Sequence, residues 1–212
     1  TGAAVSNLAL LNEDGNANGS FNPNPNGAVN TIVAQPDGRL LVGGAFTTMA
    51  GTAHNRLARF NADGTLDASF NPDAGDQVYT LAVQADGKIV DGGAFTALNG
   101  TARNRLARLN ADGSLDVTFN PDAGDSVYTL VVQPDGSLVA GGAFTTMGGT
   151  ARNRLARLSA GGSVDGSFNP DANGPVNALA LQADGQIIVG GAFTAIGGTA
   201  RNYLARVGTN GS

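Results

Sequence analysis

The chain contains no cysteine and no tryptophan, and only one lysine, one glutamate and one histidine among its 212 residues. Without cysteine, disulfides, thiolate metal sites and cysteine nucleophiles are excluded. A single histidine cannot supply a metal cluster that needs several imidazoles, nor the proton relays built from more than one. No apolar run reaches the length of about eighteen residues that a membrane span requires. We therefore expect no cofactor, no metal and no membrane insertion.

The charged residues are few and of short or rigid types. Sixteen of the 17 acidic residues are aspartate and eleven of the 12 basic residues are arginine, for a net charge of −5. The scarcity of long flexible helix formers argues against helices. The absence of a basic cluster argues against a nucleic-acid partner. The first ten residues lack the basic and apolar parts of a secretion signal, so any signal is expected to have been removed. The lysine-poor, Asn/Gly/Thr-rich composition is typical of secreted or cell-surface bacterial proteins.

What the chain does contain is one segment written four times. "VGGAFTTMAGTAHNRLAR" at 42–59 returns with small changes three times, and the phenylalanine falls at 46, 95, 144 and 193. The period is 49 at every step, without insertion or deletion, and four units cover 196 of the 212 residues. Such a unit cannot bury its apolar face alone and must stack on its neighbours. We expect a single repeat domain over 1–212, with a partial unit at 1–23, units beginning near 24, 73, 122 and 171, and a terminal strand at 202–208.

Within a unit the apolar residues alternate with polar ones. The segments 78–84, 88–96, 104–110 and 114–121 each have the pattern of a short strand. Asp-Gly dipeptides join the first pair and most copies of the last pair, and this is a strong hairpin signal. Four short antiparallel strands in about 50 residues are typical of propeller blades. The predicted fold is therefore all-β, a β-propeller built from four 49-residue, four-stranded antiparallel blades.

Individual positions in the unit have expected roles. The double glycine at 43–44 and its equivalents allow close backbone approach, and the following phenylalanine fills the space between blades. We expect one large apolar residue in each polar loop to pin that loop to the core. These anchors are Met49, Leu98, Met147 and Ile196.

Three arginines and three aspartates lie at positions symmetric about a hairpin turn. In the first, degenerate copy both charges are lost together, at Leu10 and Asn18. Residues symmetric about a hairpin turn face each other, so we predict three ion pairs, each contributing about 0.5–1 kcal/mol if partly exposed. The pairs are Arg59–Asp67, Arg108–Asp116 and Arg157–Asp165.

The unit "RLARLNADGSLDVTFNPDAGDSVYTLVVQPDGSLVAGGAFT" resembles the delta-60 repeat, a β-propeller family of bacterial and often secreted proteins. The double glycine also resembles that of a Kelch blade. The resemblance covers nearly the whole chain, through "LNADGSLDxxF" and "QPDGxLxxGG". It implies a propeller and brings no established activity or catalytic residues.

Two sets of aspartates could in principle do chemistry. The turn residues Asn110, Asp112 and Asp116 suggest part of a calcium loop, yet one copy of the turn is Gly161-Gly162, which retains the bend and loses the carboxylate. The connecting loops carry two carboxylates each, at Asp73/Asp76 and Asp122/Asp125. Paired carboxylates serve glycosidases, but nothing near these offers a second role. We interpret the first set as turns and the second as solvated loops, and rate a hydrolase lowest.

His54 and Asp91 each differ from their equivalents in other units. His54 stands where the other units have arginine, and we interpret it as a surface substitution. Asp91 stands where the others have Val or Ala, just before the double glycine. Because an unpaired buried carboxylate is costly, we expect it to face the solvent of a central channel; the alternative is that it marks one blade as different.

The best binding candidates are the repeated polar residues of the Gly-Thr-Ala-Arg-Asn loop, which suit a protein or a repetitive glycan partner through avidity. An alternative is that they hold the loop and the neighbouring blade together. The candidates are Arg103, Asn104, Arg105, Arg152, Asn153, Arg154, Arg201 and Asn202.

The sequence thus favours a non-enzymatic extracellular propeller that serves as a structural or adhesive interaction scaffold. The alternative function is a lectin-like, multivalent glycan-binding propeller with one weak site per blade. Ring closure stays open, because Leu8–Asn12 and Leu204–Gly208 are copies of the same strand and compete for one place. An open array, a homo-oligomer or strand-complemented assembly, and an excerpt from a longer propeller are the alternatives that avoid this conflict.

Overall fold

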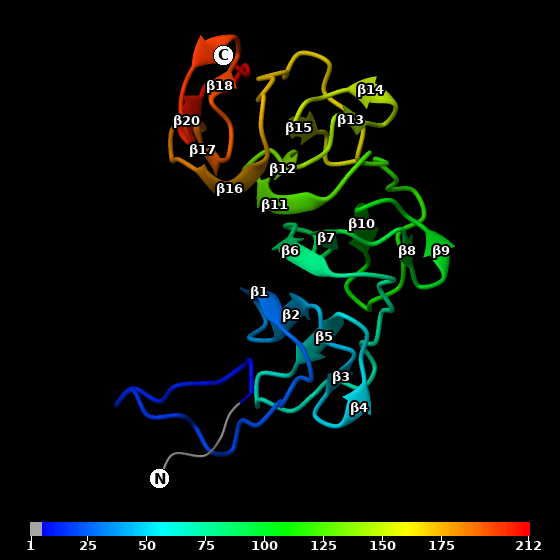
Figure 1. The fold of residues 1–212 in the computed structure, drawn as a ribbon. Coiled ribbons are helices and arrows are strands. Elements are labelled where there is room, and N and C mark those ends of the chain that lie inside the picture. Colours follow the sequence, from blue (N-terminus) through cyan, green and yellow to red (C-terminus); the bar gives the residue numbers. More distant parts are fainter. Residues whose placement is uncertain (1–5) are drawn as a thin grey trace.

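The computed structural model describes residues 6–212, and the first five residues of the predicted partial unit 1–23 lie outside it. Within the described part every regular element is a β-strand (Figure 1). The all-β prediction is therefore confirmed. Asp-Gly and Gly-Gly turns close the hairpins as the sequence pattern requires. The second residue of each turn is a glycine with positive φ.

Each 49-residue unit forms one three-stranded antiparallel sheet, which we call a blade. The unit's first strand is the inner edge, the second is central and the third is the outer strand. The first blade contains β1 (Val29–Ala34), β2 (Leu40–Gly44) and β5 (Leu57–Phe60); the second β6 (Val78–Val83), β7 (Ile89–Gly93) and β10 (Leu106–Leu109); the third β11 (Val127–Val132), β12 (Leu138–Gly142) and β15 (Leu155–Leu158); the fourth β16 (Val176–Leu181), β17 (Ile187–Gly191) and β20 (Leu204–Val207).

A separate two-stranded ribbon interrupts each unit between its central and outer strands. The sequence pattern predicts only a loop over this stretch. The ribbons are β3 (Thr48–Met49) with β4 (Thr52–Ala53), β8 (Ala97–Leu98) with β9 (Thr101–Ala102), β13 (Thr146–Met147) with β14 (Thr150–Ala151), and β18 (Ala195–Ile196) with β19 (Thr199–Ala200).

The expected fourth strand is reduced to a single bridge in each unit that contains it. In the second unit Leu109 bridges Leu115 and the ladder then stops. The physical reason is the next aspartate: Asp116 Oδ1 accepts a hydrogen bond from the Thr118 backbone N–H at 3.0 Å, which bends the chain into a turn. The carboxylate that was predicted to pair with arginine thus also ends the strand.

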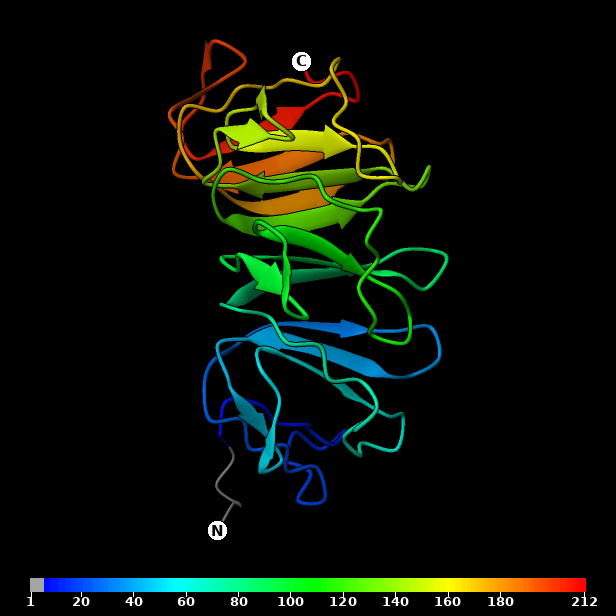
Figure 2. The same ribbon diagram turned by 90° about the vertical axis from the view of Figure 1, so that its right-hand side faces the viewer.

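The four blades form an open arc (Figure 1). The inner strands contact one another in the order β1, β6, β11, β16. The paired ribbons lie on the outer side of the arc. Figures 1 and 2 show the first and fourth blades at opposite ends of the molecule, with the segment 6–22 beside the first blade. Both ends of the arc therefore present a blade face that no other blade covers.

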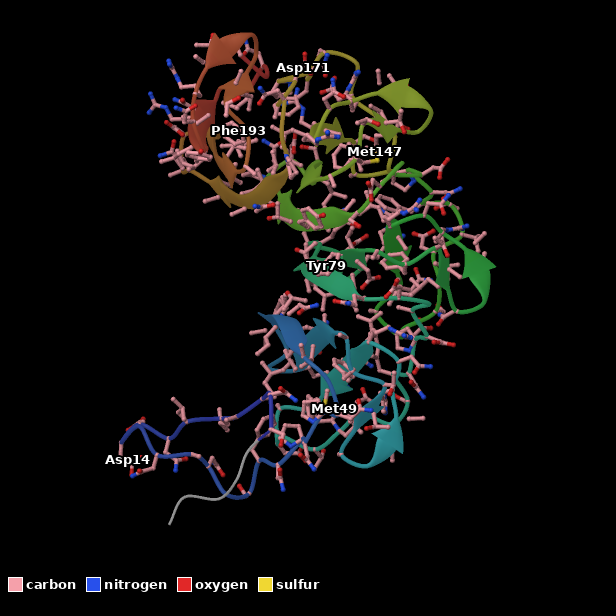
Figure 3. The ribbon with its side chains drawn as sticks, in the orientation of Figure 1. Asp14, Met49, Tyr79, Met147, Asp171 and Phe193 are labelled. Atoms are coloured by element: carbon pink, nitrogen blue, oxygen red, sulfur yellow. The ribbon has the colours of Figure 1, made fainter. Side chains whose placement is uncertain are left out.

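The hydrophobic core lies between blades rather than within them. One cluster joins Leu41 and Leu57 of the first blade to Phe95 and Leu109 of the second, and all four are fully buried. The double glycine permits this contact: a Cβ on Gly43 would lie 2.8 Å from Val78 Cγ1 of the next blade, too close for any side chain. The anchors of the loops are also buried, and Figure 3 shows Met49 and Met147 at equivalent places of their blades.

Candidate functional site

A β-bulge occurs in the inner strand of every blade. In β6 the register shifts between Val78 and Thr80, so Tyr79 has no partner in β7. A bulge re-aims a side chain out of the ladder, and bulges often occur near functional sites. The bulge residues of the four blades form a row along the inner side of the arc, where Figure 3 labels Tyr79. They are Asn30, Tyr79, Tyr128 and Asn177.

Contacts link the row across the first three blades. The ring centroids of Tyr79 and Tyr128 are 5.5 Å apart in an edge-to-face arrangement. Asn30 Nδ2 donates a hydrogen bond to the Val78 carbonyl of the next blade at 3.0 Å. Burial, and then the proximity of Tyr128 and Asp76, raise the pKa of the Tyr79 hydroxyl. Both tyrosines stay partly exposed and the two asparagines are exposed, so the row offers an aromatic centre with an amide at each end.

The row is not among the sites predicted from the sequence. A signal was present: "VYT" begins the inner strand in the two central units, and "VNT" or "VNA" begins it in the outer two. The alternation rule assigns the second residue of these strands to one face, and the bulge that changes its direction leaves no mark in the pattern.

The predicted binding arginines of the central blades are directed into the protein. Arg103 and Arg152 are buried, and each donates to the carbonyl of the preceding alanine. Arg103 also donates to the Val117 carbonyl at 3.1 Å, and Arg152 to the Asp165 carbonyl at 3.1 Å. These contacts hold the loop against the turn that follows the outer strand.

The other predicted binding residues are partly or fully exposed. Asn104 and Asn153 donate at 2.7 Å to Asp122 and Asp171, which belong to the connection into the next blade. Arg154 donates to the carbonyls of Ala143 and Phe144, and Arg105, like Arg154, has positive φ. In the fourth blade Arg201 and Asn202 are exposed.

Each predicted arginine–aspartate pair has an ion pair in the structure. The Nη2–Oδ2 distances are 2.8 Å for Arg59–Asp67, 2.9 Å for Arg108–Asp116 and 2.7 Å for Arg157–Asp165. The guanidinium of Arg59 also stacks 4.3 Å from the Phe70 ring centroid and donates to the Ala111 carbonyl of the next blade at 2.6 Å. The first two pairs are buried and the third is partly exposed, and each arginine also donates to a carbonyl of the next unit.

The carboxylates of these pairs are held in the charged form. Hydrogen bonds from Lys88 and Thr118, together with Arg108, keep the pKa of Asp116 far below its usual value. Hydrogen bonds from Ser167, followed by Arg157, lower the pKa of Asp165 to about 2. Such groups stabilise the fold above the ordinary pKa of aspartate and lose that contribution as pH falls.

The aspartates of the connecting loops are exposed; Asp122 accepts from Asn104, as described above, whereas Asp76 and Asp125 bond locally. Asp76 and Asp125 accept from the backbone N–H of the following residue at 2.7 and 2.6 Å. In the hairpin turn, Asp112 accepts from the Ser114 backbone at 2.9 Å. Across residues 6–212 no three His, Cys, Asp or Glu side chains gather as a metal site would require.

The surface interpretation of His54 is wrong. Its exposed fraction is 3%, and its Nδ1 has no hydrogen-bond partner. Burial lowers the pKa of its imidazole, and the neutral ring fits that environment. The equivalent residues Arg103 and Arg152 are also buried, so this loop position is interior in the first three units, whereas Arg201 of the fourth is exposed.

The channel interpretation of Asp91 is also wrong. Its exposed fraction is 0%, and neither carboxylate oxygen has a hydrogen-bond partner. It lies in the centre of β7, paired with Leu81 and Ala107 on the two flanking strands. Burial raises the pKa of its carboxyl well above the usual value. The side chain lies between the first two blades rather than in a channel, as its equivalent Ala140 lies between the second and third.

No helix in the described part of the chain is long and apolar enough to cross a membrane.

Several solved structures share this architecture. The WD40 β-propeller domain of Doa1 has a TM-score of 0.56 at 18% identity, over 81% of this chain and 50% of that one. A streptogramin B lyase has a TM-score of 0.55 at 14% identity, over 92% of this chain and 59% of the lyase. The extracellular domain of the putative hybrid two-component system BT3049 from B. thetaiotaomicron has a TM-score of 0.55 at 14% identity, over 91% of this chain and 24% of that one. This chain thus spans less than two thirds of each, and the likeness concerns the fold.

No curated protein matches the sequence. A family model does match all four repeats, at residues 35–70, 84–119, 133–168 and 182–212. Its description is "Domain of unknown function (DUF5122) beta-propeller". The matched segments begin near the first hairpin of each blade and cover most of the chain. The protein therefore belongs to the DUF5122 β-propeller family.

Proposed function

We propose that this chain is a non-catalytic interaction scaffold at the bacterial cell surface or outside the cell, with the bulge row as its contact surface. The observation that carries the proposal is the pair of tyrosines from adjacent blades, 5.5 Å apart, at bulges that turn them out of their sheets. Tyrosine supplies a large contact area at low entropic cost and is enriched at interfaces.

The setting of the row supports a binding role. Each tyrosine comes from a strand that contacts the inner strands of both neighbouring blades, so the backbone beneath it is fixed. A site on rigid elements loses little entropy when a partner binds. Several polar candidates of the central blades, by contrast, already bond within the protein: Arg103 and Arg152 to backbone carbonyls, and Asn104 and Asn153 to aspartates.

The extracellular part of the proposal has separate support. One of the similar folds is the extracellular domain of a bacterial two-component system. The repeat also resembles the delta-60 repeat of often-secreted proteins, and we include that finer identification in the proposal. A scaffold whose core lies between blades needs no disulfide, consistent with the absence of cysteine.

The test is adhesion of beads coated with the purified chain to bacterial cells. We expect the double variant Tyr79→Ala/Tyr128→Ala to reduce bead binding several-fold, because it removes the aromatic centre of the row. Tyr203→Ala is the matched control, since Tyr203 is 64% exposed on the fourth blade, away from the row. Equal binding by the wild type and the double variant would remove the row from the proposal.

A glycan partner is the second candidate, because the row places tyrosine hydroxyls and asparagine amides at blade spacing. Repeated weak contacts at fixed spacing give avidity for a repetitive ligand. Periodate treatment of the cells destroys sugar diols, and protease treatment removes surface proteins. Loss of bead binding only after periodate would favour the glycan, and loss only after protease would favour a protein partner.

A further inference from the structure

A cavity of about 450 Å³ lies at the paired ribbon β13–β14 of the third unit, on the outer side of the arc (Figure 1). Its walls come from the end of the second unit at Thr118 and Pro121, the ribbon turn at Gly148 and Thr150, and the hairpin turn at 161–164. Every residue that lines the cavity is uncharged. The volume is typical of small-molecule sites, and the lining favours a neutral ligand over an ion.

In the second unit a side chain fills the equivalent place. Asn99 stands where the third unit has Gly148, and the two residues have similar backbone φ angles, +51° and +57°. The amide of Asn99 is bonded through both of its polar atoms. Its Oδ1 accepts from the Asp73 backbone N–H at 2.8 Å, and its Nδ2 donates to the Gly113 carbonyl at 3.2 Å. Asn99 therefore shows which chemical group this place accepts, a neutral amide that uses one acceptor and one donor.

The third unit has the same backbone groups but no amide between them. Asp122 and Gly162 are the equivalents of Asp73 and Gly113. Within residues 6–212, neither the Asp122 backbone N–H nor the Gly162 carbonyl has a hydrogen-bond partner. Gly113 is buried in the second unit, whereas Gly162 is partly exposed. The place that is occupied in the second unit is therefore open in the third.

The Pro-Asp peptide that borders the cavity differs between the two units. Asp122 has left-handed backbone, with a φ of +54°, whereas Asp73 does not. In the second unit the N–H of this peptide faces the Asn99 amide. In the third unit the carbonyl oxygen of the same peptide, on Pro121, lies 3.5 Å from the position of a Cβ on Gly148. This contrast indicates that the peptide is turned over where no amide is present. Left-handed backbone is strained at a residue other than glycine, so an amide that turned the peptide back would relieve the strain.

We propose that this cavity binds the acetamido group of an N-acetylated sugar. The acetamido N–H donates to the Gly162 carbonyl, and the acetamido oxygen accepts from the Asp122 N–H once the peptide has turned. The methyl group takes the place of the Asn99 Cβ. That place adjoins an apolar side chain, because a Cβ on Gly148 would lie 3.2 Å from Val164 Cγ2.

The rest of the cavity suits a sugar ring better than the side chain of a protein partner. A volume of about 450 Å³ exceeds that of a single amide. Thr118, Thr150 and Ser163 line the cavity and are exposed, so their hydroxyl groups can exchange hydrogen bonds with those of a sugar. None of the lining residues is acidic, so the free ammonium of an amino sugar would find no carboxylate among them. The N-acetylated form is therefore favoured.

The first test is a titration of the purified chain with N,N′-diacetylchitobiose, followed through its backbone amide NMR spectrum. We expect shifts at Asp122, whose peptide turns, and at Ser163, whose N–H shares a peptide with the Gly162 carbonyl. The readout is specific to the third unit, which matters because the fourth unit also has a glycine, Gly197, at the position of Gly148. Cellobiose, which lacks acetamido groups, is the matched ligand and should leave both signals in place. Shifts with both sugars, or with neither, would overturn the proposal.

Propionamide separates a sugar from a protein side chain, because it has the primary amide of asparagine or glutamine and no ring. We expect the dissociation constant of the chitobiose to be about tenfold lower than that of propionamide, since the ring adds contacts with the hydroxyl groups. Equal dissociation constants would show that the cavity recognises amides alone. That result would overturn the sugar assignment.

Copying the second unit into the third should close the site. Gly148→Asn places an amide side chain on a backbone that already has the φ of Asn99, and the chitobiose shift at Asp122 should disappear. Gly149→Asn is the matched control, because a Cβ there meets nothing within 4 Å and the residue does not line the cavity. The control should bind as the wild type does. Unchanged binding by Gly148→Asn would overturn the proposal.

The reverse change should open a new site in the second unit. In Asn99→Gly we expect chitobiose to shift the amides of Asp73 and Ser114, which should not respond in the wild type. Unchanged signals from β16 and β17 would show that the variant is folded. A folded variant without the new shifts would contradict the role of Asn99 as the internal occupant of this place.

The cavity and the bulge row are tested separately. The paired ribbons lie on the outer side of the arc and the row on its inner side (Figures 1 and 3). The titrations use no cells and change no residue of the row. A negative result therefore leaves the proposed scaffold function standing, and equal bead binding by the tyrosine variant leaves the cavity proposal standing.

Discussion

The interface between the first and second blades and the interface between the second and third are copies of each other, yet they differ at one central position. In the second interface the position is Ala140, which is fully buried in an apolar cluster. In the first it is Asp91, equally buried and without a hydrogen-bond partner. Both residues lie in the middle strand of their blade, paired with apolar residues on each side.

The difference shows that the fold tolerates a large free-energy cost at one interface position when the surrounding contacts are the same as in the other interface. A desolvated, unpaired carboxyl costs on the order of 1–3 kcal/mol. The rest of the first interface, including the ion pair of Arg59 with Asp67 and its bond to the next blade, matches the second. We infer that these shared contacts hold Asp91 in place and that the first interface is the weaker one.

The largest expected effect comes from copying the carboxylate into the second interface. Ala140→Asp should destabilise the protein by about 2–6 kcal/mol, from an unpaired polar group and from overpacking. The midpoint of urea unfolding measures this change. Ala140→Val is the control for size alone and should cost clearly less. Equal losses for the two variants would mean that packing rather than the carboxylate separates the interfaces.

The reverse change should make the interfaces alike. Asp91→Val, which installs the residue of the first and fourth blades, should stabilise the protein by about 1–3 kcal/mol. Hydrogen exchange should slow in β6 and β7 more than in β16 and β17. The wild type should also lose stability as pH rises from about 4, because the unfolded carboxyl ionises there while the folded one has a raised pKa.

The slope of that loss is at most about 1.4 kcal/mol per pH unit for one proton, and Asp91→Val should remove it. The shift is opposite in sign to that of Asp116 and Asp165, whose stabilising contribution declines only as pH falls below about 4. An unchanged pH slope in Asp91→Val would contradict the burial of an unpaired carboxyl at this interface.

The smallest expected effect concerns Lys88, which gives Asp116 a partner that Asp67 lacks. Lys88→Gln should cost no more than about 1 kcal/mol, because the lysine side chain is 32% exposed. The cost should shrink in high salt and should vanish below the pKa of Asp116, where the carboxylate is protonated. Arg39→Gln, at the equivalent position of the first blade, is the control. A loss that persists in high salt would point to packing instead.

Much of the fold can be predicted from the sequence because each sequence signal occurs in several copies of the repeat. The period of 49, the alternating strands and the Asp-Gly turns place the blades, and the joint loss of charge at Leu10 and Asn18 indicates the arginine–aspartate pairing. The truncated fourth strand could not be predicted from alternation, because the aspartate that pairs with arginine also turns the chain. The paired ribbons have only two residues per strand, too short for a periodic signal.

The candidate site was harder to predict than the fold. Arg103 and Arg152 have the composition of an exposed polar loop, and only the structure shows their guanidinium groups bonded to interior carbonyls. His54 was misassigned for the same reason. The direction of Tyr79 depends on a bulge, which is a property of strand register. Asp91 is the one polar residue at a strand position that is apolar in the other units. The sequence alone does not indicate which residues surround its carboxyl group.

The hydrogen bonds from Arg59, Arg108 and Arg157 each reach a carbonyl 52 residues further along the chain. A gene that lost or gained part of a unit would misalign with its acceptor the arginine whose 52-residue span contains the change. Recombination between whole units leaves the spacing intact. Lineages carrying this repeat should therefore differ in length by entire multiples of the unit.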